Sequence, residues 1–144
     1  PQVDALVDAL SRPEAQTRWE VLDALSAVAE TNADSVAGAY DGAEASLFDD
    51  ASATVRLAAF VFLTRLAGSS PERSDEAWPL LDEAIQCYHG DAEYRDMLVA
   101  LLALARGQAS EATRAALADR VRFDAENGAG YIKALSAEIL QALA

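Results

Sequence analysis

Cys87 and His89 are the side chains in this sequence best suited to chemistry, and they stand two positions apart. A thiol and an imidazole can act as nucleophile and base, or as two ligands of a metal ion. The chain has one cysteine and one histidine, so no second pair completes such a metal site. We interpret His89 as a solvated turn residue beside a small apolar cysteine. The sequence therefore predicts no metal, no cofactor and no enzyme activity.

Asp49 and Asp50 are the next candidates, because two carboxylates can serve as a general acid and a general base. They stand in a turn, where we expect both to be solvated, and no glycine-rich phosphate loop accompanies them. An enzyme-associated role stays open as an alternative: a regulatory subunit, or a repeat-type enzyme acting on a protein or a modified base. An acid clustered with His89 in a deep pocket would favour that alternative.

The charge balance argues against several classes of partner. The chain has 24 acidic and 11 basic residues, a net charge of -13 and a pI near 4.2. Nucleic acids and anionic membranes both require a basic surface. The longest apolar run, 97–105, is about half the length of a membrane-spanning helix. With a lone cysteine and no signal peptide at the start of the sequence, these features predict a cytoplasmic protein.

Ten of the basic residues are arginines and one is a lysine. Depleted lysine with abundant acids is typical of a salt-loving archaeon, where a dense acidic surface keeps proteins soluble, and a high-GC bacterium gives the same arginine bias. We therefore do not interpret acidity alone as a site for cations or basic peptides.

Four basic residues recur at nearly equal spacing: Arg18, Arg56, Arg95 and Lys133, separated by 38, 39 and 38 residues. We call them the basic ladder. A leucine follows each of them seven positions later, and apolar side chains mostly stand four and ten positions later. This spacing indicates one buried stripe on a helix. A fixed period of about 20 to 50 residues is typical of stacked repeats.

Each repeat reads as two antiparallel helices, which predicts an all-α superhelix of about eight helices in a single domain, 1–144. The first helices are expected at 18–30, 55–67, 97–105 and from 133, and the second helices at 35–48, 75–88 and 111–124. The repeats span about 13–50, 51–90 and 91–128, with partial repeats at 1–12 and 129–144. Helices 55–67 and 97–105 are apolar almost all round, so we expect neighbours to cover both sides of each.

Local signals add detail to the second helices. Ser74 and Ser110 are expected to cap the helices that follow them. Pro79 should start its helix late or kink it. Gly38 and Gly42 either form a flat strip for a partner, pack closely on a neighbouring helix, or mark a break near Asp41 and Gly42.

The turn before Arg56 reads Asp49-Asp50-Ala51-Ser52-Ala53-Thr54-Val55-Arg56, and weaker copies precede Arg18 and Arg95. This acidic turn followed by Val-Arg, with paired helices and a period near 38, resembles the HEAT-repeat family of α-solenoids, to which armadillo repeats are the near neighbour. The resemblance implies a curved stack whose second helices line the concave face, and a role in binding proteins. It also implies that the basic ladder pairs with turn acids between repeats, here Glu14, Asp50 and Asp91, rather than forming a binding row.

We predict a non-catalytic protein-interaction module or scaffold whose partner is another protein. The contact surface is expected on the second helices, as a concave row with Trp19 as an additional hot-spot candidate or core-edge residue. The residues of this row are Asp41, Glu76, Glu83 and Arg114. A self-assembling structural protein, forming a homo-oligomer through its C-terminal helix, is a second alternative.

Overall fold

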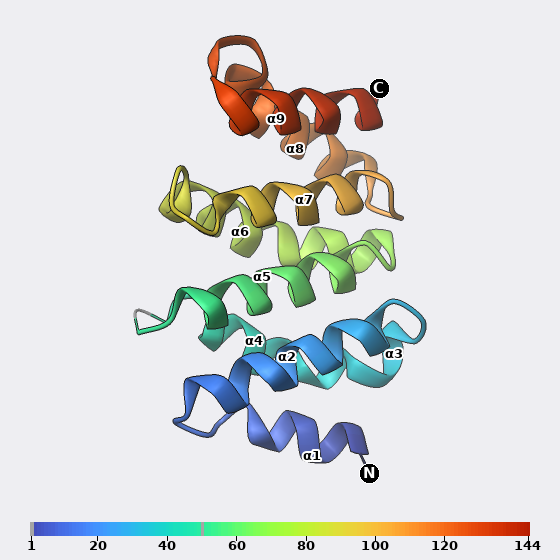
Figure 1. Cartoon of the computed structure of the whole chain (residues 1–144). Helices are drawn as coiled ribbons and strands as arrows, with labels where there is room; N and C mark the ends of the chain where they lie inside the picture. Colours follow the sequence, from blue (N-terminus) through green and yellow to red (C-terminus); the bar gives the residue numbers. More distant parts are fainter. Residues whose placement is uncertain (1, 50) are drawn as a thin grey trace.

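The computed structural model describes residues 2–49 and 51–144, which form helices, turns and short loops with no strand. In order, the helices are α1 (Gln2–Ala9), α2 (Ala15–Ala29), α3 (Ala33–Val36), α4 (Tyr40–Leu47), α5 (Ala53–Ala67), α6 (Pro71–Tyr88), α7 (Tyr94–Ala105), α8 (Glu111–Asn127) and α9 (Gly130–Leu143), with a 3₁₀ turn, η1 (Ala37–Ala39), between α3 and α4. They stack in antiparallel pairs from α1 at one end to α9 at the other (Figure 1). The predicted all-α repeat stack is confirmed.

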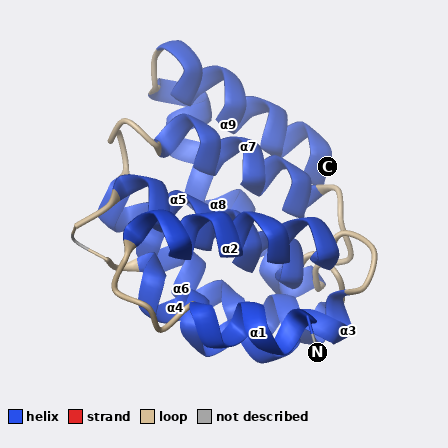
Figure 2. Cartoon of the chain, turned by 60° about the horizontal axis from the view of Figure 1, so that its bottom comes forward, coloured by secondary structure: helices blue, strands red, loops and turns tan. Residues whose placement is uncertain are grey.

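The helices fall into two layers. The first helices of the pairs, α2, α5, α7 and α9, form one layer, and α1, α4, α6 and α8 form the other (Figures 1 and 2). The first and last residues of these helices lie within four residues of the predicted ones. None of the helices in the described ranges combines the length and apolar character needed to cross a bilayer.

The second helix of the first repeat is interrupted. Residues 33–47 form α3, η1 and α4 in succession, so the break falls at Ala37–Ala39 rather than near Asp41. The two glycines of this segment differ in their surroundings. A Cβ on Gly42 would lie 2.8 Å from the side chain of Leu10, whereas a Cβ on Gly38 would meet no atom within 4 Å. Gly42 therefore allows Leu10, the residue that follows α1, to pack closely on α4, and Gly38 faces open space.

Serine residues fix the starts of three helices. Ser52, Ser70 and Ser110 each accept a hydrogen bond from the backbone N–H three residues later, which satisfies a free donor at the helix start. Ser110 is a cap as predicted, but Ser70 takes the role predicted for Ser74. As a result α6 begins at Pro71 and Pro79 lies inside it. Of the two effects predicted for Pro79, a late helix start is therefore wrong, and a kink stays a prediction.

Ser74 has a different function, because it joins two repeats. It is fully buried, and its hydroxyl accepts a hydrogen bond from the Ser110 N–H at 2.9 Å while donating to the Pro71 carbonyl. This contact fixes the start of α8 against α6.

The core lies between the two layers and is richest in the central repeats. Its largest fully buried side chains include Phe60, Phe62, Tyr94, Met97 and Leu101. These residues belong to α5 and α7, which pack against neighbours on both flanks. The prediction for 55–67 is thus largely confirmed. For 97–105 it is wrong in part, because Val99 keeps 50% of its surface exposed and Ala103 is exposed too.

The two layers are packed unequally, and this sets the curvature. Contacts between α2 and α5, α5 and α7, and α7 and α9 are extensive, whereas α6 and α8 touch at few points and α4 and α6 at fewer still. A stack bends toward the layer whose helices lie closer together. We therefore call α2, α5, α7 and α9 the inner layer, and α1, α4, α6 and α8 the outer layer. The expectation that the second helices line the concave face is wrong.

The two ends of the stack differ from its middle. No residue of α1 is buried, and α9 buries only Ser136 and Ile139. Glu138 is exposed on α9 at the position where α7 carries the buried Ala100, five places after the respective ladder residue. A charge at this position is a polar cap of the kind that terminal repeats need. Self-association through α9 stays a prediction.

Candidate partner-binding surface

The basic ladder lies on the inner layer and joins successive repeats. Arg18 forms an ion pair with Asp49, and Arg56 pairs with Glu93 at 3.1 Å, so each spans from one repeat to the turn of the next. The Arg95 guanidinium lies 6.0 Å from the ring centroid of Tyr131, an aromatic partner at the same step. The predicted pairing of the ladder with turn acids is therefore confirmed for Arg18 and Arg56, whereas Arg95 has an aromatic partner in place of an acid.

The acids that complete the rungs differ from those predicted. Asp49 and Glu93 take the role, in place of Glu14 and Asp91. Asp50, the third predicted acid, lies outside the described residues. The Asp49 carboxylate also accepts the Ala51 N–H at 2.8 Å. The pKa of Asp49 is lowered, mainly by this backbone hydrogen bond and further by the Arg18 guanidinium.

Arg56 makes the most complete rung. One guanidinium nitrogen donates to the Asp49 carbonyl at 2.7 Å and another to Glu93, and the group lies 5.1 Å from the Tyr88 ring centroid. Both side chains of the pair are shielded, with 16% of Arg56 and 7% of Glu93 exposed. These contacts occupy the guanidinium within the stack, so Arg56 is a structural residue.

The outer layer is joined by polar contacts nearer to solvent. Arg73 pairs with Asp34, and Arg120 donates to both carboxylate oxygens of Asp82 at 2.6 and 3.0 Å. Asp75 accepts from the Thr113 hydroxyl at 3.1 Å. Each contact spans 38 or 39 residues, so the outer layer repeats at the same step as the ladder.

His89 meets an acid, which is one of the two features that would favour the enzyme alternative. Its Nε2 lies 2.7 Å from an Asp124 carboxylate oxygen, and its ring is 4.9 Å from that of Tyr94. The hollow beside them has a volume of about 320 Å³ and includes Phe123, which is 71% exposed. Cys87 is exposed and is not part of the lining, so thiol and imidazole do not converge. Burial raises the pKa of the Tyr94 hydroxyl, which disfavours a phenolate base. In the described part of the chain, no three His, Cys, Asp or Glu side chains gather as a metal site would need.

The predicted acidic row is brought together only in part. Asp41 and Glu76 are both exposed and both lie near Tyr40, whose hydroxyl donates to the Glu76 carbonyl at 3.5 Å. The pKa of Tyr40 is raised by burial first and then by Glu76, Glu44 and Asp41. Glu83 is exposed two turns farther along α6. These acids form a patch on the outer layer.

Arg114 and Trp19 lie apart from that patch. Arg114 donates to the Ala105 carbonyl at 2.7 Å, and to the carbonyls of Ala142 and Leu143 at 3.5 and 3.4 Å. Its guanidinium thus satisfies free carbonyls at the ends of α7 and α9, which is a structural role. Trp19 is half-buried against the core. Neither residue continues the predicted row.

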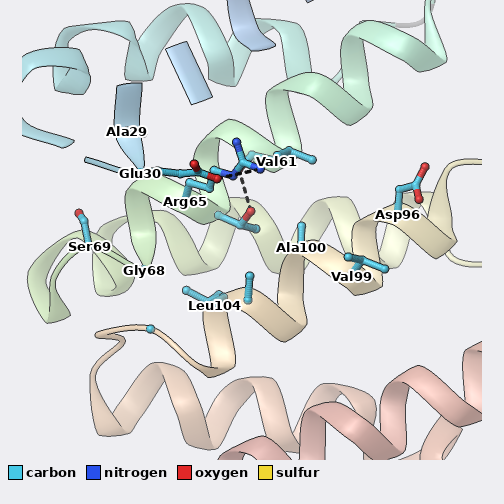
Figure 3. Close-up of a pocket in the computed structure, with 13 residues that line it drawn as sticks. Ala29, Glu30, Val61, Arg65, Gly68, Ser69, Asp96, Val99, Ala100 and Leu104 are labelled. Carbon is cyan, nitrogen blue, oxygen red and sulfur yellow. Dashed lines mark hydrogen bonds and ion pairs between the residues drawn. The ribbon is translucent and has the colours of Figure 1, made fainter. Parts of the chain in front are cut away.

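A groove on the inner layer was not predicted. It has a volume of about 470 Å³ and lies between α5 and α7, with the end of α2 above it (Figure 3). We call it the inner groove. Its apolar lining is Val61, Val99, Ala100, Ala103 and Leu104.

Small residues create the inner groove. Ala100 and Ala103 leave space that larger side chains would fill. At one end α5 and α7 are held together, because the Gln108 N–H donates to the Gly68 carbonyl at 2.8 Å. A Cβ on Gly107 would lie only 2.9 Å from that Gly68 oxygen, so glycine permits this approach. The groove is therefore closed where the helices meet and open along their middle.

Charged groups flank the groove unequally. Glu30 and Arg65 form an ion pair at 3.2 Å beside it, so each neutralises the other. Asp96 lies apart from this pair, near Val99 (Figure 3). Asp96 forms no ion pair with another described residue. The groove thus has an apolar centre and one carboxylate, Asp96, that no described basic side chain pairs with.

The repeats contain a sequence signal for this groove. Five places after the ladder residues stand Asp23, Val61, Ala100 and Glu138. The two central repeats are apolar here and the two terminal ones are acidic. Comparing this position across the repeats therefore indicates which repeats form the groove. The apolar stripe within a single repeat gives no such indication.

Comparison with known proteins supports the fold. No protein-family model and no curated protein matches the chain. Among solved structures, a designed armadillo repeat protein in complex with the peptide (KR)4 is similar, with a TM-score of 0.76 and 17% sequence identity. The match covers 99% of this chain and 64% of that protein's chain. A second designed armadillo repeat protein gives 0.73 and 17%, with the same coverage, and an engineered protein gives 0.68 and 16%, covering 98% and 62%. The chain thus spans less than two thirds of each. These likenesses show that the chain has the armadillo/HEAT-like helical-repeat fold, an all-α superhelix.

Proposed function

We propose that this chain is a non-catalytic protein-binding module that receives a segment of its partner in the inner groove. The observation that carries the proposal is the open apolar groove on the concave side of a repeat stack. Val99 is half exposed at its edge, although buried apolar residues otherwise dominate α7. Exposed apolar surface of this kind, set among polar residues, marks binding sites.

The fold comparison is consistent with a peptide or protein as the ligand. One structural neighbour is a designed repeat protein in complex with the peptide (KR)4. The inner groove of this chain offers both apolar contacts and carboxylates to such a segment. We place this function in the cytoplasm, because Cys87 is a free, exposed thiol.

The outer acidic patch is a second candidate surface. Asp41 and Glu76 gather at Tyr40, with Glu83 on the same helix as Glu76. These acids would recognise a basic surface, whereas the inner groove would recognise an apolar side chain. Two pairs of substitutions therefore separate the candidates.

The test is selection from a displayed library of random dodecapeptides against the wild-type protein. Peptides that bind are then measured on two variants that each gain two lysines: Val99→Lys with Ala103→Lys, and Glu76→Lys with Glu83→Lys. We expect the groove variant to bind at least about tenfold more weakly, since a buried aliphatic contact contributes about 1.5–3 kcal/mol. The outer variant should bind as the wild type does.

The opposite pattern would move the site to the outer layer. A library that yields no peptide above background would contradict the proposal altogether. Circular dichroism at the working temperature must show that both variants remain folded, which we expect because all four positions are exposed.

A further inference from the structure

We infer that the inner groove selects a partner segment with a bulky apolar side chain and, two positions from it in extended conformation, an arginine or lysine. This inference rests on the proposed function, and it specifies the chemistry of the ligand. Its elements are the volume of the groove, the spacing along α7 and the distribution of charge.

The apolar half of the motif follows from the shape of the groove. A volume of about 470 Å³ lies within the range of pockets that bury small ligands. Ala100 and Ala103 provide space rather than bulk, and Val61 and Leu104 provide apolar contacts. An aliphatic or aromatic side chain from the partner would fill this space, and an alanine would leave most of it empty.

The basic half follows from Asp96. Glu30 has a counter-ion in Arg65, but Asp96 has none in the part of the chain that the structure describes. A cationic side chain of the partner would form an ion pair with Asp96. A carboxylate at the same place would be repelled by Asp96 and by the net charge of -13.

The spacing follows from helix geometry. Asp96 and Ala100 lie four residues apart on α7, which places them on one face and about 6 Å apart along the helix axis. Side chains two positions apart in an extended peptide point to the same side and are separated by about 6.6 Å. An apolar residue in the groove and a basic residue at Asp96 therefore match positions i and i+2 of an extended segment.

Blocked pentapeptides test the inference by isothermal titration calorimetry. The probes are Gly-Leu-Gly-Arg-Gly and its reverse, Gly-Arg-Gly-Leu-Gly, of which the tighter binder is compared with versions that carry Ala for Leu or Glu for Arg. We expect about tenfold weaker binding with Ala, from the lost apolar burial. With Glu we expect about three- to tenfold weaker binding, as for an exposed ion pair.

A variant isolates the role of Asp96. Asp96→Asn should bind the Arg and Glu peptides about equally, while Glu126→Gln, an exposed charge removal on α8, should keep the full preference for Arg. Salt at 1 M shortens the Debye length to about 3 Å, so it should weaken the preference for Arg and leave the preference for Leu.

Equal binding of Arg and Glu peptides to the wild type, or a preference for Arg that survives in Asp96→Asn, would overturn the inference. Either result would leave the inner groove as a peptide site. Failure of every pentapeptide to bind would also overturn it, and the library selection would then decide the proposed function separately.

Discussion

The inner and the outer layer of this stack connect successive repeats by different interactions. On the inner layer, helices pack along their lengths and the Arg56–Glu93 pair is shielded from water. On the outer layer, helices are spaced more widely, and pairs such as Arg120–Asp82 are more exposed.

This difference explains why the groove forms where it does. In the closely packed inner layer, neighbouring helices present a continuous apolar surface. Small residues on that surface therefore leave a hollow lined by apolar side chains and not by polar ones. Ala100 and Ala103 produce such a hollow between α5 and α7. A hollow of about 330 Å³ between α6 and α8 is lined instead by Asp82, Asp119 and Arg120, together with Trp78 and Ala116.

The largest expected effect compares one rung from each layer. Arg56→Ala should lower the free energy of unfolding by roughly 3 kcal/mol or more, because it leaves the buried Glu93 carboxylate without its counter-ion. Arg120→Ala should cost about 0.2–1 kcal/mol, because 39% of the Arg120 side chain is exposed. Chemical denaturation of both variants measures the difference. Equal costs would show that the two layers contribute alike.

A second comparison uses one glycine from each layer. Gly107→Ala should destabilise the protein by about 1–3 kcal/mol, because its Cβ would force apart the backbones that meet at Gly68. Gly38→Ala should stabilise it by about 0.4–1 kcal/mol, because its Cβ enters open space and the unfolded chain loses freedom. Thermal unfolding of the two variants gives opposite shifts in Tm. A loss of stability in Gly38→Ala would show that the outer layer is packed more tightly there than described.

The smallest effect concerns pH and the Arg18–Asp49 rung of the inner layer. The pKa of Asp49 is lowered in the folded protein, so its ionised form contributes stability above its unfolded value of about 3.9. That contribution is lost as the pH falls through the lowered pKa. The stability gap between wild type and Asp49→Asn should therefore be constant from pH 7 to 5 and narrow below pH 4.

Arg18→Gln provides the control for this prediction. In the Arg18→Gln background, Asp49→Asn should still change the free energy of unfolding, by less than it does in the wild type. Part of the effect remains because the Ala51 N–H makes the larger contribution to the lowered pKa of Asp49. A gap that does not change between pH 7 and 3 would contradict the lowered pKa.

Much of the fold could be predicted from the sequence. The basic ladder predicted the repeat length, and the leucines seven places after it correctly marked the buried stripe of α2, α5 and α7. The residues four places after it are buried in α2 and α5 but exposed in α7 and α9. Helix starts were less certain where serines competed. Ser70 precedes α6 and Ser74 lies in its first turn, and only the neighbouring repeat decides that the Ser74 hydroxyl bonds to Ser110.

The binding surface could not be predicted in the same way. The side of the curvature depends on how closely helices from different repeats approach, which no single repeat encodes. Placing the second helices on the concave side led to Asp41, Glu76, Glu83 and Arg114, yet Arg114 is occupied by carbonyls at the ends of α7 and α9. Val99 looked like one more buried apolar residue, and only its neighbours show that it is half exposed.

The most direct test of the central claim, that the inner layer is the binding face, is a methyl NMR map of a bound peptide. The tightest peptide from the library selection would be titrated into protein labelled at Ala, Leu and Val methyl groups. We predict that the Val99 and Ala103 signals shift with a common saturation curve, while Leu80 on the outer-layer helix α6 does not respond. Shifts at Leu80 with Val99 and Ala103 unchanged would contradict the claim and place the binding face on the outer layer.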